Sequence, residues 1–109
     1  MTIKQRKKMY QYVQQQLEQE SKTLAPDNYR EATAGFCYYI DLYCRQTNIS
    51  FNPYYQGNIK ANLPELWAKK PSSYYRAPHV RALGYWFSLK QSGIKKRIQI
   101  LKEIISEMK

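Results

Sequence analysis

The chain has 109 residues, 43 % of them hydrophobic, and a formal net charge of +10 at pH 7. This length and composition predict one compact domain over residues 1–109 and exclude a chain that is disordered over most of its length. No apolar run approaches the roughly 20 residues of a membrane span, so we expect a soluble, cytoplasmic protein with no membrane partner.

Residues 2–24 predict a first helix with a narrow apolar stripe. The stripe consists of Ile3, Met9, Tyr10, Val13, Leu17 and Leu24. It leaves two alternatives, packing along the domain or self-association into a homo-oligomer. Arg6 and Glu20 occupy intermediate positions of the stripe, which disfavours a coiled coil. The basic N-terminus, residues 1–8, is expected either to begin this helix or to fray.

A second helix is predicted from Asn28, which can form a capping box with Glu31, to about Gln46. Apolar side chains cover most of its circumference, as in a helix enclosed on two sides. They are Phe36, Cys37, Tyr39, Ile40, Tyr43 and Cys44. We expect both cysteines to be small core residues, because an apolar face does not activate a thiol. The Tyr38-Tyr39 pair is assigned to the core with them.

Residues 47–62 are rich in Asn, Pro, Gly and Ser and predict a long connector, with Tyr54 and Tyr55 in its middle. Asn62 and Glu65 then predict a capping box for a short helix over residues 63–70. One or two helical turns are expected at residues 79–83. A sheet-containing alternative would place strands within residues 47–60 or 84–89, where β-branched and aromatic residues favour them.

The last segment, residues 84–108, predicts an aromatic cluster followed by a strongly amphipathic helix. Its apolar face is Ile94, Ile98, Leu101, Ile105 and Met108, flanked by Ile100 and Ile104. We expect Trp86 and Phe87 to seal this helix against the second one. The whole pattern predicts an all-α domain, a bundle of three main helices and one or two short ones, with the second and last helices at its centre.

Positive charge at the start of the last helix points to an anion site. Ser92 is the predicted N-cap, and Lys95, Lys96 and Arg97 follow in the predicted first turn, where the helix dipole disfavours cations. The alternative is an ordinary solvated face. If an anion binds there, Arg97, at the edge of the apolar stripe, is the expected forked phosphate contact. The full predicted ligand site combines Ser92, Lys95, Lys96 and Arg97 with Arg76, Arg81, Tyr74, Tyr75, Tyr54 and Tyr55.

The chain contains 11 tyrosines, and two adjacent pairs fall in basic connectors, Tyr54-Tyr55 and Tyr74-Tyr75. Aromatic rings beside Lys and Arg can stack a base and hold its phosphate. Two alternatives remain open, because loop tyrosines can also cover the core or form a protein interface.

The sequence contains no catalytic motif, and we expect a protein that is not an enzyme and uses no cofactor. No glycine-rich phosphate loop and no GxSxG motif occur. With one histidine, His79, and no CxxC pair, a metal site has few possible ligands. A Cys–His nucleophile would have to pair His79 with Cys37 or Cys44, and nothing in the sequence activates either thiol.

Four motifs in this order resemble short hypothetical proteins of bacteriophage genomes. They are Gly35-Phe36-Cys37, Leu63-Pro64-Glu65-Leu66, Tyr85-Trp86-Phe87 and Gly93-Ile94-Lys95-Lys96-Arg97-Ile98, and the resemblance covers roughly residues 35–105. The final helix departs from that pattern, which is usually more acidic and has a second tryptophan. The resemblance implies an accessory phage protein, a class that includes sponges for nucleotide immune signals. It supplies no catalytic residues.

Three functions remain open at this stage. The first is a phage anti-defence protein that binds a nucleotide or a cyclic oligonucleotide in a cationic-aromatic pocket. The second is a DNA- or RNA-binding protein, including an inhibitor of a nucleic-acid-guided complex. The third is an interaction module for an acidic host partner, such as a defence protein. All three follow from the basic residues concentrated between residues 45 and 102, where Glu65 is the only acid.

Overall fold

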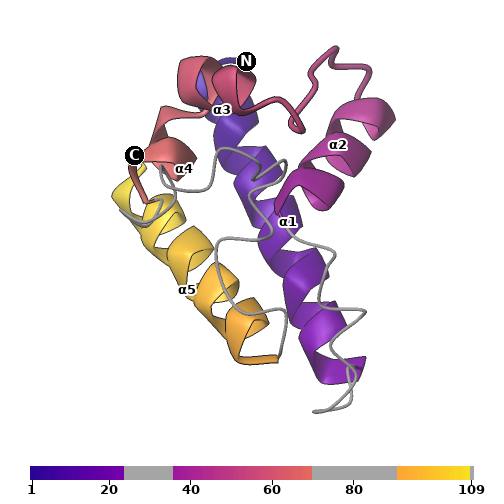
Figure 1. The fold of residues 1–109 in the computed structure, drawn as a ribbon, viewed down its shortest axis with the longest axis vertical. Helices are drawn as coiled ribbons and strands as arrows, with labels where there is room; N and C mark the ends of the chain where they lie inside the picture. Colours follow the sequence, from indigo (N-terminus) through magenta and orange to yellow (C-terminus); the bar gives the residue numbers. More distant parts are fainter. Residues whose placement is uncertain (24–35, 70–90, 109) are drawn as a thin grey trace.

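The computed structural model describes residues 1–23, 36–69 and 91–108 (Figure 1). Within these ranges the chain forms helices and no strand, so the fold is all-α, as predicted. The helices are α1 (Ile3–Thr23), α2 (Phe36–Gln46), α3 (Gln56–Asn62), α4 (Pro64–Ala68) and α5 (Gln91–Glu107). Three are long and two are short, which confirms the predicted bundle. The predictions for the Asn28 capping box, the turns at 79–83 and the Trp86-Phe87 seal lie outside the described residues.

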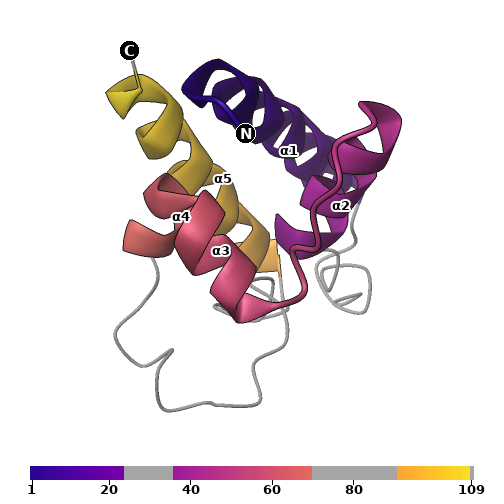
Figure 2. The same ribbon diagram turned by 90° about the horizontal axis from the view of Figure 1, so that it is seen from above.

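Helix α1 is the central element. It packs against both α5 and α2. Figure 1 shows α1 between these two helices, and Figure 2 shows α2 directly beside α1, with α5 across from them. The prediction that the second and last helices form the centre is therefore wrong. The physical reason is the stripe on α1, which buries Met9, Tyr10, Val13 and Leu17 completely and so provides the surface that the other helices share.

Helices α1 and α5 run antiparallel along a common seam. The Lys7 ammonium donates to the backbone oxygen of Met108 at 3.3 Å, which places the start of α1 beside the end of α5. The buried residues of α5 are Ile94, Arg97, Leu101 and Ile104. This 3-4 spacing is that of a two-helix seam. The predicted face is therefore confirmed in part. Ile94 and Leu101 are buried as predicted, and Ile98 and Ile105 are half-buried against the core, but Arg97 and Ile104 take the fully buried positions between them.

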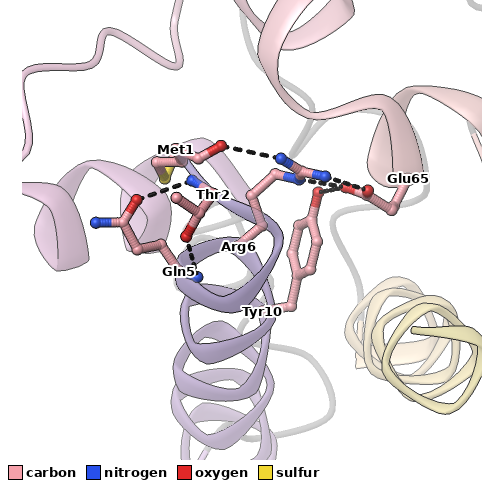
Figure 3. A network of polar contacts seen from close by, with 6 residues as sticks. All are labelled: Met1, Thr2, Gln5, Arg6, Tyr10 and Glu65. Carbon is pink, nitrogen blue, oxygen red and sulfur yellow. Dashed lines mark hydrogen bonds and ion pairs between the residues drawn. The ribbon is translucent and has the colours of Figure 1, made fainter. Parts of the chain in front are cut away.

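The N-terminus of α1 begins with a capping box that the sequence analysis did not identify (Figure 3). The backbone N–H of Thr2 donates to Gln5 Oε1 at 2.8 Å, and the backbone N–H of Gln5 donates to Thr2 Oγ1 at 3.2 Å. These reciprocal bonds satisfy two N–H groups that have no partner within the helix. The helix therefore begins at Ile3, and the alternative of a frayed basic terminus is not what the structure shows.

The segment after α2 contains more structure than the predicted connector. Two residues after the end of α2, Asn48 has a φ of 58°, a left-handed conformation that Asn tolerates. The backbone N–H of Ile49 then donates to the backbone oxygen of Cys44 at 2.8 Å. Helix α3 then forms because Ile59 and Leu63, four residues apart, are both completely buried. The prediction of an irregular connector through residue 62 is wrong for this part.

The predicted capping box of the short helix is also wrong. Helix α4 begins at Pro64, whose fixed φ suits the first helical position, and Leu63 is its N-cap without a side-chain hydrogen bond. Asn62 instead ends α3, where its side-chain N–H donates to the oxygen of Asn58 at 3.0 Å. The Glu65 side chain therefore takes no part in a capping box and contacts other residues instead.

The apolar surface predicted for the second helix is confirmed in α2, with one exception. Phe36, Cys37, Ile40 and Cys44 are buried, and both cysteines carry free thiols. Burial first, and then the charge of Asp41, raises the pKa of the Cys44 thiol, which keeps it unreactive. Tyr38 is the exception, because its side chain is 49 % exposed.

Candidate functional site

The predicted anion site at the start of α5 does not have the expected helix-terminal geometry. Helix α5 begins at Gln91, so Ser92 lies inside the helix and is not its N-cap. Lys95 and Lys96 then lie in the second turn, where the helix dipole acts only weakly. Their side chains are exposed. The basic residues on which the predicted anion site was based therefore do not lie at the N-terminal end of the helix.

Arg97 lies in the core rather than at the edge of the apolar stripe. Its side chain is completely buried in the α1–α5 seam. Burial lowers the pKa of this guanidinium, and the negative charge of Glu20 on α1 partly opposes the effect. Glu20 in turn accepts a hydrogen bond from the Tyr39 hydroxyl at 2.9 Å. The charges of Arg97 and Glu20 and the Tyr39 hydrogen bond link α5, α1 and α2. Arg97 therefore serves the fold rather than a surface ligand site.

A second charged cluster closes the other end of the seam (Figure 3). Arg6 of α1 donates from Nε and Nη2 to the two oxygens of Glu65 of α4, at 3.0 and 2.9 Å. The Tyr10 hydroxyl donates to the same carboxylate at 2.9 Å. Partial burial opposes ionisation of Glu65, but the hydrogen bonds from Arg6 and Tyr10 outweigh it and lower the pKa of this carboxyl group.

All the described acids are engaged by other described side chains. The pairs are Glu18 with Gln14, Glu20 with Tyr39, Asp41 with Arg45, Glu65 with Arg6, Glu103 with Lys69, and Glu107 with Lys69. Four of these six acids, Asp41, Glu65, Glu103 and Glu107, form ion pairs with cations of the chain. The excess positive charge is left on the lysines of the surface.

Five of these lysines form what we call the lysine face: Lys4, Lys8 and Lys22 on α1, and Lys95 and Lys102 on α5. All five are exposed, and none forms an ion pair with another residue of the described ranges. Lys4 and Lys22 are 18 residues apart, which is five turns of helix, so they lie on one stripe about 27 Å long. Lys95 and Lys102, seven residues apart, likewise share one side of α5.

The lysines of α1 and the lysines of α5 lie on the same side of the α1–α5 pair. Glu103 and Glu107 mark the flank of α5 that faces α4, because both pair with Lys69. Lys95 and Lys102 lie on the opposite flank, beside the half-buried Ile98 and Ile105. On α1, Arg6 binds Glu65 of α4, and Lys4 and Lys8 lie two residues to either side of Arg6, roughly 200° around the helix. The lysines of both helices therefore lie on the side away from α4.

Of the remaining predicted ligand residues, Tyr54 and Tyr55 are exposed, at 44 % and 66 %. Burial first, and then the charge of Asp41, raises the pKa of the Tyr54 hydroxyl, so this ring lies beside α2. Neither tyrosine belongs to the lysine face. Arg76, Arg81, Tyr74 and Tyr75 lie outside the described residues, and their part in a site stays a prediction.

Four residues of the lysine face, Lys4, Lys8, Lys22 and Lys102, were not among the predicted site residues. The spacings of 18 and 7 residues could have indicated two shared helical stripes. What the sequence could not supply was the antiparallel contact of α1 with α5, which brings the stripes to one side.

Comparison of the chain with protein-family models, with curated protein sequences and with solved structures gives no match. Among the described residues, no helix combines the length and the apolar character that crossing a bilayer requires. The same residues contain no group of three or more His, Cys, Asp or Glu that could hold a metal ion. The chain's own surface is therefore the basis for a functional assignment.

Proposed function

We propose that the protein binds nucleic acid through the lysine face and is not an enzyme. The observation that carries this proposal is the arrangement of exposed lysines along about 27 Å of α1 and the adjoining part of α5. On α1 the lysines lie at the two ends of this length, Lys4 and Lys8 at one end and Lys22 about 21 Å further along, so they suit separate phosphates of an extended chain rather than one phosphate group. A single nucleotide would contact only a small part of the lysine face.

The contacts that such a face can make are to the phosphate backbone. Ammonium groups act as point charges and carry no information about base sequence. We therefore expect affinity that depends strongly on salt and weakly on sequence. A nucleotide pocket remains a prediction that depends on residues 74–81. The assignment to a phage protein that counters a host defence system is likewise a proposal, supported by the motif resemblance alone.

Titration of a fluorescent 20-base-pair duplex at several salt concentrations tests the proposal. Each phosphate contact contributes about −0.9 to the slope of log affinity against log salt. Replacement of Lys95 and Lys102 together by Gln should reduce the steepness of that slope by about 1.8. Lys60→Gln, on exposed α3, is the matched control and should change it little.

Other outcomes assign the other functions. A shallow slope with saturable binding of a cyclic dinucleotide at a fixed stoichiometry would favour the pocket. Duplex binding that the double lysine variant leaves unchanged would contradict the role of the lysine face. Circular dichroism of each variant shows whether the fold is retained.

A further inference from the structure

A polar hollow lies between the segment that follows α2 and helix α3. Its volume is about 480 Å³, and the described residues that line it are Ser50, Phe51, Asn52, Asn58 and Asn62. None of these side chains carries a charge. The hollow therefore suits a neutral polar group rather than a phosphate.

The three asparagine amides are held in fixed orientations by the chain itself. Asn52 Oδ1 accepts from the backbone N–H of Tyr54 at 3.0 Å. The Asn58 side chain donates to the backbone oxygen of Asn52 at 2.9 Å, and the Asn62 side chain donates to that of Asn58 at 3.0 Å. Each amide thus has one half engaged. The Oδ1 atoms of Asn58 and Asn62 remain as acceptors, and the Nδ2 group of Asn52 remains as a donor.

Phe51 adds an apolar wall to this polar set. Its ring is half-buried and packs against the core, so one part of it is fixed while another lines the hollow. A ligand that fits must combine a flat apolar surface with donors and acceptors at its edge. Nucleobases have this combination, and a free phosphate does not.

We propose that the hollow binds a nucleobase with an exocyclic amino group, adenine or cytosine, presented by an unpaired stretch of nucleic acid. The amino group supplies two N–H donors for the Asn58 and Asn62 oxygens, and the neighbouring ring nitrogen accepts from Asn52 Nδ2. The base lies against Phe51. This inference rests on the proposed function only in taking nucleic acid as the source of the base, because the hollow lies on α3, which packs against α4, and the lysine face lies away from α4.

Nucleosides separate this site from the lysine face because they carry no phosphate. Adenosine, cytidine, uridine and ribose are titrated into the isotope-labelled full chain, and the side-chain amide resonances of Asn52, Asn58 and Asn62 are followed by NMR. Adenosine and cytidine should shift these resonances. Uridine presents a carbonyl oxygen where they present an amino group and so loses the hydrogen bonds to both the Asn58 and Asn62 oxygens. It should bind about 25-fold more weakly, at about fivefold for each hydrogen bond. Equal shifts by uridine or by ribose, or no shifts at all, would overturn the inference.

Asn62→Ala provides the test by mutation. Among the residues that the structure describes, the side chain of Asn62 bonds within its own helix at an exposed position, so the fold should be retained. Affinity for adenosine should fall about fivefold, while affinity for the duplex should not change. Gln11→Ala, which removes an exposed amide from α1, is the matched control for adenosine binding and should leave the affinity for adenosine unchanged. Unaltered adenosine binding in Asn62→Ala would overturn the assignment.

The two proposals can fail separately. Adenosine binding by a protein that binds no duplex would support the hollow and contradict the proposed function. Duplex binding that depends on Lys95 and Lys102, in a protein that shifts no asparagine resonance with adenosine, would support the lysine face and contradict the hollow.

Discussion

The charges in the α1–α5 seam and the charges on the lysine face have opposite environments. In the seam, Arg6 is held by Glu65, and Arg97 is buried where the charge of Glu20 acts on it. On the lysine face, the ammonium groups are exposed and form no ion pair with a described residue. Both regions belong to the same pair of helices and differ only in which side of each helix they occupy.

This difference shows how a strongly basic chain can be both folded and receptive to an anion. Burial makes an uncompensated charge costly, so the seam takes acidic partners for its arginines. Exposed lysines cost little without a partner, because water solvates them. Four of the described acids form ion pairs with arginine or lysine side chains of the chain, and the lysines of the lysine face are left without such a pair among the described residues. Substitutions in the two regions should therefore have very different consequences.

Arg97→Gln should have the largest effect on stability. It would remove a buried guanidinium on which the charge of Glu20 acts, at a cost of about 3–5 kcal/mol in unfolding free energy. Chemical denaturation measures this loss. Lys96→Gln, at the adjacent exposed position, is the matched control and should change stability by less than about 0.5 kcal/mol. Equal stability of the two variants would show that Arg97 is not part of the seam.

This expectation reverses the one that the sequence alone suggested. There, Arg97 lay at the edge of the apolar stripe and was the expected phosphate contact. The buried positions of α5 are three and four residues apart, and Arg97 falls on one of them. Hydrophobic periodicity assigns charged residues to the surface by default, so it turned the face towards Ile98 and Ile105 instead.

Glu65→Gln should have an intermediate effect that depends on pH. The pKa of Glu65 is lowered in the folded protein, so its contribution is present above its ordinary pKa of 4.5 and is lost as pH falls through the folded value. At pH 7 the variant should lose about 1–3 kcal/mol, because Arg6 and Tyr10 lose a charged acceptor.

Thermal unfolding of both proteins between pH 7 and pH 3 measures the effect. The difference between wild type and Glu65→Gln should shrink steadily below pH 4.5 as the wild-type carboxyl group becomes protonated. Glu107→Gln, at an exposed carboxylate, serves as the control. A difference that stays constant over this range would contradict the role of the ionised carboxylate.

The long helices could be predicted from the sequence, but the contacts between residues of different helices could not. Local signals identified α1, α2 and α5, because repeated apolar spacing is a property of each segment alone. The partner of Arg6 is Glu65, which lies 59 residues away, and a capping box with Asn62 was the nearer explanation for that acid. The asparagine hollow was equally inaccessible, since it requires the left-handed turn at Asn48 and the unpredicted helix α3.

Arg45→Gln should have a small effect, although it also breaks an ion pair. Arg45 pairs with Asp41 at 3.2 Å one turn away on α2, but its side chain is 77 % exposed. Exposed pairs at this spacing contribute about 0.3–0.5 kcal/mol to stability. Denaturation at low salt measures the loss, and 1 M salt should remove most of it. A loss as large as that of Glu65→Gln would show that exposure does not separate the two kinds of pair.

Lys4→Gln should have the smallest effect and the opposite sign. Lys4 lies in the first turn of α1, where the helix dipole disfavours a cation, and Lys8 is four residues further on the same side. Removing one of two like charges at this spacing should raise the unfolding free energy by about 0.3 kcal/mol at low salt. At 1 M salt, where the screening length is about 3 Å, the gain should disappear. In the presence of saturating duplex the sign should reverse, because the wild type gains a phosphate contact that the variant lacks. A gain that persists in the duplex would mean that Lys4 does not contact nucleic acid, and it would confine the lysine face to the remaining lysines.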